Sequence, residues 1–270
     1  MPRPSRDQQS IRNQYLVDGF YMVDDIVLNK CLVNAAVEGM EEICAGRYDR
    51  GREPDESVWN PGDDSNKLCK IENPQRANHA VYDLVRHPAL GQLAAQMTGA
   101  KMVQVWWVQL LIKPAHLSGS KNKTNIGWHQ DRHYWSCWEE SSELFTAWCA
   151  LSDVQPDCGP MIFLRESHQW GYLKGRSDFA AQEQNMDSWR QELESQGRMW
   201  HEVPNLLPAG GISFHNHLTF HGSKANYSGR PRRSLAIHMR TENSAPLSEP
   251  NHLTSYLNDP DVCPIVYGRE

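Results

Sequence analysis

Two histidines, one aspartate and one arginine are the residues of this chain best placed to do chemistry together. His129 and Asp131 are two residues apart, so on a β-strand their side chains would project from one face and could bind one metal ion. His221 would complete a set of two imidazoles and one carboxylate that leaves three coordination positions open, as non-haem Fe(II) oxygen chemistry requires. A turn-rich segment separates His221 from Arg232, which predicts that Arg232 begins a returning strand beside His221. Its guanidinium could grip the far carboxylate of a dicarboxylic 2-oxoacid.

The same residues allow other interpretations. His129 and Asp131 could be a surface pair on an ordinary strand, and a pair of this kind taken alone favours that interpretation. His215 and His217 share the spacing of two residues. With His221 they could form an all-nitrogen site for zinc or copper.

The elements that must position these residues follow from hydrophobic periodicity. It predicts helices at residues 7–17, 29–45 and 77–98, the last broken at residues 87–88. It predicts strands at residues 20–27, 102–113, 127–131, 144–154, 161–164, 211–215, 217–222 and 233–240. Residues 46–66 read as a loop, and residues 171–197 as an insert with a helix at 179–193.

These elements indicate a mainly β fold. We expect a double-stranded β-helix, a cupin-like jelly-roll, with N-terminal helices and a helical insert over its mouth. We expect one domain over residues 1–270, with a helical part at about 1–100, a β core at about 101–240 and a tail at 241–270.

Composition narrows the class of protein. The 27 Lys and Arg against 33 Asp and Glu leave a net charge of −6, which argues against nucleic acid as a partner. The N-terminus lacks the apolar stretch of a signal peptide, and the most apolar segment, residues 102–112, is too short to span a bilayer. Seven cysteines without a Cys-x-x-Cys pair read as free thiols. We therefore expect no membrane partner and a cytoplasmic location.

Three blocks of sequence resemble the phytanoyl-CoA dioxygenase family of Fe(II)/2-oxoglutarate oxygenases. They are residues 127–135, residues 144–161 and residues 213–233, within a similarity that runs over about residues 18–240. The resemblance implies that His129, Asp131 and His221 bind iron, and it leaves His215 and His217 as core groups or supports of the ligands. It also implies that four groups contact 2-oxoglutarate: Arg232 on the C5 carboxylate, Ser223 beside it, Trp148 as a wall, and Gln109 or Leu110 on the preceding strand.

The family resemblance also implies a reaction. Fe(II), 2-oxoglutarate and O2 would oxidise an unactivated C–H bond of a small molecule, by hydroxylation or by desaturation, with release of succinate and CO2. A carboxylate at Asp131 argues against halogenation, which needs a small residue there. Because no basic cluster that could hold CoA phosphates is evident, we favour a metabolite or natural-product intermediate. An acyl-CoA hydroxylase of the same family, a cupin-like metal-dependent hydrolase or isomerase, and a non-catalytic binding protein remain as alternatives. The oligomeric state stays open.

Four residues are candidates for contact with substrate. Tyr134 and Trp135 follow the metal block and could form an aromatic wall. His133 could orient substrate or be structural. Arg165 lies where the family usually has a proline and a glycine before Ser-His, so residues 165–166 either alter the local turn or face the substrate.

Overall fold

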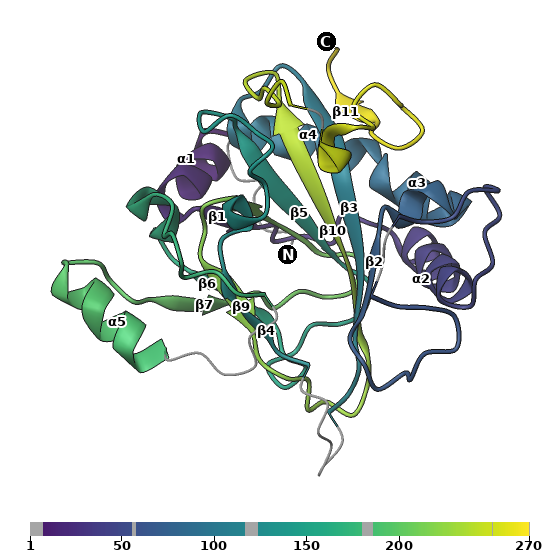
Figure 1. Ribbon diagram of the computed structural model, residues 1–270, viewed down its shortest axis with the longest axis horizontal. Helices are drawn as coiled ribbons and strands as arrows, with labels where there is room; N and C mark the ends of the chain where they lie inside the picture. Colours follow the sequence, from purple (N-terminus) through teal and green to yellow (C-terminus); the bar gives the residue numbers. More distant parts are fainter. Residues whose placement is uncertain (1–7, 56–57, 117–123, 180–185, 250, 270) are drawn as a thin grey trace, which may run out of the picture.

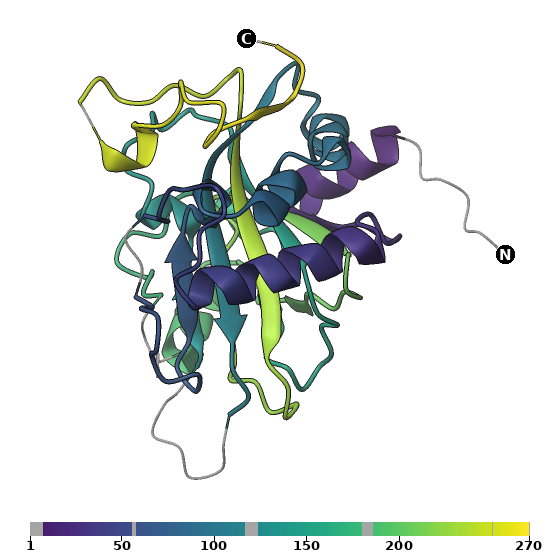
Figure 2. The ribbon, with the colours of Figure 1, turned by 90° about the vertical axis from the view of Figure 1, so that its right-hand side faces the viewer.

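The computed structural model describes residues 8–55, 58–116, 124–179, 186–249 and 251–269. Two antiparallel β-sheets form a jelly-roll, and helices cover the outer face of the larger sheet (Figure 1). Turned by 90°, the same ribbon shows α2 lying across this sheet (Figure 2). The predicted jelly-roll is confirmed.

The larger sheet has seven strands. Its order is β1 (Phe20–Met22), β8 (Ile212–Asn216), β5 (Leu144–Ala150), β10 (Arg232–Thr241), β3 (Val103–Lys113) and β11 (Ile265–Tyr267), with β2 (Cys69–Glu72) also pairing with β3. The smaller sheet has the order β4 (Ile126–His129), β9 (His221–Ser223), β6 (Met161–Leu164) and β7 (Glu202–Pro204).

Five α-helices and four short 3₁₀ turns complete the described elements. The helices are α1 (Gln8–Asp18), α2 (Lys30–Cys44), α3 (His79–Val85), α4 (Pro88–Thr98) and α5 (Met186–Ser195). The turns are η1 (Pro74–Arg76), η2 (Asp131–His133), η3 (Ser167–Trp170) and η4 (His252–Thr254). Asn29 caps α2 by accepting from the Leu32 amide at 3.0 Å, and Pro88 separates α3 from α4 as predicted. Residue 7 and residues 180–185 of the predicted helices lie outside the described residues. Within the described part of the chain, no helix is both long enough and apolar enough to cross a bilayer.

The side-chain alternation of β3 explains how the two sheets enclose a site. Val108 and Leu110 join the core beneath the helices, together with α2 residues such as Met40. Leu111 points the other way, into a second core between the two sheets that also contains Trp148. The space between the sheets is therefore lined by every second residue of the long strands.

Several predicted strands differ from the structure. The strand expected at residues 127–131 ends at His129, and Asp131 begins η2 instead. The strand expected at residues 217–222 begins only at His221, as β9. The residues before it form a turn in which the Thr219 amide donates to the Asn216 carbonyl at 2.8 Å. The strand at residues 20–27 stops at Met22.

Two further differences concern pairing. The returning strand that carries Arg232 does not lie beside His221: β10 pairs with β3 and β5 in the larger sheet, while β9 belongs to the smaller one. The short strands β2, β7 and β11 were not predicted. Each has only three or four residues, which is too short for a periodic signal.

Candidate metal centre and co-substrate pocket

Three predicted ligands meet between the sheets. His129 ends β4, Asp131 begins η2 and His221 begins β9, and one ligand atom from each lies within 4.8 Å of the other two. Asp131 Oδ1 is 3.7 Å from His129 Nε2 and 3.8 Å from His221 Nε2. These separations are too long for hydrogen bonds, so the three atoms face a common space rather than one another.

Backbone carbonyls orient both imidazoles. His129 Nδ1 donates to the Gly127 carbonyl at 2.7 Å, and His221 Nδ1 donates to the Thr219 carbonyl at 2.9 Å. With its proton on Nδ1, each ring presents the lone pair of Nε2 to the centre. Gln130, between the first two ligands, donates to the Gly171 and Leu218 carbonyls and so connects this turn to the insert.

The second oxygen of Asp131 is held by the larger sheet. Oδ2 accepts from Thr146 Oγ1 at 3.0 Å and from His215 Nε2 at 3.2 Å. Because Thr146 donates to the carboxylate, its oxygen is free to accept from His238 Nδ1 at 2.8 Å. These contacts leave Oδ1 directed at the two histidines and assign His215 to supporting a ligand.

The electrostatics of the centre fit a divalent cation. Burial lowers the pKa of His129 and of His221, so both rings are neutral and can act as ligands. Burial alone would raise the pKa of Asp131, but the hydrogen bond from His215 and the surrounding imidazoles hold it well below its usual value. Three buried lone pairs that converge with no proton between them form a donor set that suits Fe(II).

A second group of residues forms a pocket beside the metal centre. Arg232 is buried, its Nη1 donates to the Gly159 carbonyl, and its guanidinium carbon lies 5.4 Å from the centroid of the Trp148 ring. Burial lowers the pKa of Arg232 to about 10, so the side chain stays charged at neutral pH. Ser223, Trp148 and Arg232 line this pocket together with His129 and His221.

Lys113 is a buried basic residue beside this pocket that sequence reasoning missed. It has 0 % of its surface exposed, and its Nζ donates to Ser223 Oγ at 2.5 Å and to the Lys224 carbonyl at 2.6 Å. Among the described residues, no carboxylate is in salt-bridge contact with Lys113 or Arg232. Burial and the neighbouring Arg232 hold the pKa of Lys113 well below its usual value. Arg232 is a buried cation without an acidic partner, and Lys113 bonds Ser223 beside it, so this pocket is a site for an anion.

The structure separates the two candidates on β3. Gln109 lines the pocket, whereas Leu110 belongs to the core beneath the helices. The suggestion of Leu110 as a contact is therefore wrong for a simple reason: adjacent residues of a strand point to opposite faces. Leu111, two residues from Gln109, lines the pocket as well.

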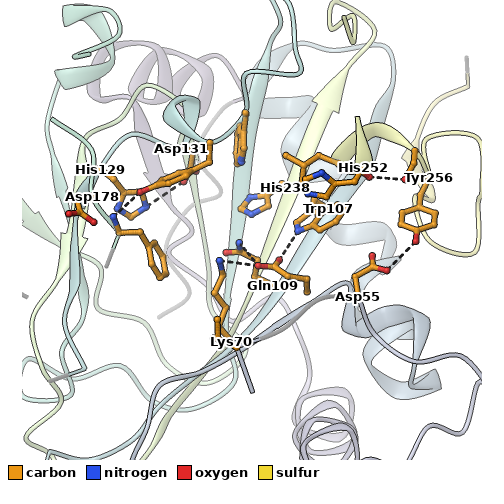
Figure 3. Close-up of a pocket in the computed structure, with 17 residues that line it drawn as sticks. Asp55, Lys70, Trp107, Gln109, His129, Asp131, Asp178, His238, His252 and Tyr256 are labelled. Carbon is orange, nitrogen blue, oxygen red and sulfur yellow. Dashed lines mark hydrogen bonds and ion pairs between the residues drawn. The ribbon is translucent and has the colours of Figure 1, made fainter. Parts of the chain in front are cut away.

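A larger cavity of about 920 Å³ opens from the metal centre. In Figure 3, His129 and Asp131 lie at one side, His238, Gln109 and Lys70 in the middle, and Trp107, His252, Tyr256 and Asp55 at the other side. Lys70 is paired with Glu72 Oε1 at 2.9 Å, and Glu72 Oε2 accepts from Trp107 Nε1 at 2.6 Å. The described lining thus combines aromatic rings with Glu72, an acidic side chain that is already paired with Lys70 and Trp107.

The predicted substrate residues divide into two pairs. Tyr134 and Trp135 line the large cavity. His133 is exposed and its Nδ1 bonds the Tyr172 hydroxyl at 2.7 Å, so it is not among the lining residues. Arg165 is also outside the lining and lies 3.6 Å from Asp18 in an ion pair.

The segment at residues 164–168 alters the local turn. Glu166 has a φ of 63°, a left-handed conformation that glycine adopts without strain. The geometry favours the altered turn over a substrate contact, because Arg165 pairs with Asp18 at the end of α1, the Glu166 amide donates to the Asp18 carbonyl, and neither residue lines the two cavities described above.

Several lining residues escaped the sequence argument because they come from segments without a recognised motif. Lys70 and Glu72 lie on β2, and His252 and Tyr256 lie in or beside η4 in the C-terminal tail. The alternation of Cys69-Lys70-Ile71-Glu72 was a usable signal for a strand with one polar face. No comparable signal marks the tail.

The profile of the phytanoyl-CoA dioxygenase (PhyH) family matches residues 15–234. The chain belongs to this family. Family membership and the converging His129, Asp131 and His221 together mark the centre as that of a non-haem iron, 2-oxoglutarate-dependent enzyme.

Solved structures share the fold. The carbocyclase SnoK from nogalamycin biosynthesis is 22% identical with a TM-score of 0.69, over 94% of this chain and 90% of that one. The epimerase SnoN from nogalamycin biosynthesis is 22% identical with a TM-score of 0.66, over 88% and 84%. EctD from S. alaskensis, solved with 2-oxoglutarate and 5-hydroxyectoine, is 16% identical with a TM-score of 0.67, over 92% and 83%. No curated protein sequence matches the chain.

Proposed function

We propose that this protein is an Fe(II)/2-oxoglutarate-dependent dioxygenase that oxidises an unactivated C–H bond of a small molecule, mainly by hydroxylation. The observation that supports this most directly is the adjacency of two sites. A buried set of two histidines and one carboxylate borders an anion pocket that Arg232 and Ser223 line, with Lys113 bonded to Ser223 from behind. Structural neighbours have been solved with Fe3+ and alpha-ketoglutarate or with 2-oxoglutarate.

In the proposed arrangement, His129, Asp131 and His221 hold Fe(II). Bound iron supplies the oxidising chemistry, with 2-oxoglutarate and O2 consumed and succinate and CO2 released. Arg232 grips the far carboxylate of 2-oxoglutarate, and Trp148 and Gln109 form walls.

Lys113 orients Ser223 in this proposal. A serine hydroxyl has one hydrogen, and Ser223 Oγ already accepts from Lys113 Nζ. Its own hydrogen is therefore available to donate into the pocket. A carboxylate arriving there would also favour the charged form of Lys113.

The large cavity is the proposed substrate site. Aromatic residues Trp107, Tyr134, Trp135, Phe179 and Tyr256 contribute to its lining, and Lys70 is the one Lys or Arg among its described lining residues. Because Glu72 pairs with Lys70, the one Lys or Arg in the described lining, and Arg76 already pairs with Asp55, a polyphosphate such as that of CoA would find no available counter-charge there. We therefore favour a neutral or cationic small molecule with an apolar or ring-containing body over an acyl-CoA.

The domain organisation and the cellular location of the protein are part of the same proposal. We infer that the chain acts as one domain, because α2 and the larger sheet share one core, and that it works in the cytoplasm, as seven free cysteines suggest.

An anaerobic optical titration tests the proposal. The apo-protein receives Fe(II) and then 2-oxoglutarate, and the expected result is the weak visible charge-transfer band of a 2-oxoacid chelated to iron. Succinate formation in air should then depend on both. Metal binding without the band and without succinate would overturn the oxygenase proposal in favour of a metal-dependent hydrolase, an isomerase or a binding protein.

A further inference from the structure

Two cysteines from different elements are in direct contact. Cys44 is the last residue of α2 and Cys69 is the first residue of β2, and their sulfurs are 3.6 Å apart. All seven cysteines are free thiols. Among the described residues, this is the single pair of cysteines whose sulfurs lie within hydrogen-bonding distance.

The two thiols differ in access and in acidity. Cys44 is partly exposed, whereas Cys69 is 2 % exposed. The hydrogen bond from the Cys69 thiol lowers the pKa of Cys44, and the positive charge of Arg233 adds to this effect. The same hydrogen bond and burial raise the pKa of Cys69. Cys44 is therefore the thiol that an oxidant would reach first and that would react with it more readily.

We propose that Cys44 and Cys69 form a reversible intramolecular disulfide when the protein encounters a peroxide. The Cys44 sulfur attacks one peroxide oxygen, the O–O bond breaks, and Cys44 becomes a sulfenic acid while water is released. The Cys69 sulfur then displaces the hydroxyl group from Cys44, the S–S bond forms, and the Cys69 proton leaves in a second water. Two thiols are oxidised and one hydrogen peroxide is reduced to two waters. Small side-chain rotations can bring the sulfurs from contact to the bonded separation of about 2.05 Å.

The bond would anchor one wall of the large cavity. It would join the two residues that flank the segment 45–68, and this segment supplies Asp55 and Val58 to the cavity lining. Lys70, next to Cys69, lines the cavity too. The segment already contacts α2 through Trp59, whose Nε1 donates to the Cys44 carbonyl at 3.2 Å. Because a cross-link restricts the unfolded chain, we expect the oxidised protein to melt roughly 5 °C higher than the reduced protein.

Peptide mapping under non-reducing conditions tests the proposal. The full chain is treated with hydrogen peroxide, its remaining thiols are alkylated, and the digest is analysed by mass spectrometry before and after a thiol reductant. The expected product is one linked pair of peptides that contains Cys44 and Cys69, is lighter by two hydrogens, and separates on reduction. Alkylation of both cysteines as separate peptides, or linkage of Cys44 to Cys31 or to a second chain, would overturn it.

Two variants test which cysteines form the link. Cys69→Ser should lose the link and leave a Cys44 sulfenic acid that dimedone traps. Cys31→Ser removes the exposed cysteine of the same helix and should retain the link and the rise in melting temperature. Because neither iron nor 2-oxoglutarate is added, the outcome is independent of the proposed function.

Discussion

The variant Lys113→Met tests whether Lys113 serves binding of 2-oxoglutarate or stability of the fold. Methionine keeps the apolar stem of a fully buried side chain but removes the Nζ group that donates to Ser223 and to the Lys224 carbonyl. A hydrogen bond to a charged group contributes about 1.5–3 kcal/mol, so we expect 2-oxoglutarate to bind roughly 10- to 150-fold more weakly. Because burial already disfavours the charged form of Lys113, the apo-protein should lose no more than about 1–3 kcal/mol, the cost of leaving the Lys224 carbonyl without its donor. The melting temperature of the apo-protein should therefore fall by less than roughly 10 °C.

The charge-transfer band provides the assay. Titration of the anaerobic Fe(II) protein with 2-oxoglutarate gives a Kd, and a separate titration measures affinity for iron, which should be unchanged. Lys224→Met is the matched control, because it removes an exposed lysine that directly follows Ser223 in the sequence. A Kd for Lys113→Met within about twofold of the wild-type value would refute the role of Lys113 in the anion pocket. A large loss of thermal stability would instead identify Lys113 as a structural residue.

Three further predictions address the ligands, the cavity and pH. Thr146→Val removes the hydroxyl that donates to Asp131 Oδ2, so iron affinity should fall about 10- to 100-fold in a competition titration; an unchanged affinity would contradict this support. Trp135→Ala removes a cavity wall that also packs edge-on against Trp106 at 4.9 Å, so it should weaken substrate binding and cost about 3–5 kcal/mol in denaturant unfolding, with binding of iron and 2-oxoglutarate retained. Burial lowers the pKa of His217 from 6.5 to about 4; since the unfolded chain then binds more protons, stability should decline as pH falls from 6.5 towards 4. His217→Gln should flatten that decline in melts across this range, and an unchanged slope would exclude His217 as its source.

Long elements of the fold were predictable, and short ones were not. The helices α2 and α4 and the strands β3, β5 and β10 each have at least seven residues and a clear apolar period, and all were expected close to their observed positions. The strands β2 and β11 are four and three residues long, and they exist because β3 offers them hydrogen-bond partners. Such strands depend on tertiary context more than on their own residues.

The convergence of the three candidate ligands was predictable even though part of the geometric argument was wrong. Asp131 is not on the strand of His129, yet its carboxylate still faces both histidines because η2 turns it inward and Thr146 and His215 hold it. Arg232 reaches the pocket from the larger sheet rather than from a strand beside His221. A short spacing between ligands limits where they can lie without specifying the backbone that carries them.

The sequence by itself determined the chemical types and order of the candidate ligands, the selection of Arg232 as the candidate anion partner, and the family. These depend on short spacings and on motifs that remain legible without coordinates. Only the tertiary structure decided that Lys113 stands behind Ser223, that Gln109 rather than Leu110 faces the pocket, and that Tyr256 shares a cavity with His129. Each of these facts depends on strand register or on contacts between residues more than a hundred positions apart, and such contacts arise only when the two sheets and the tail pack together.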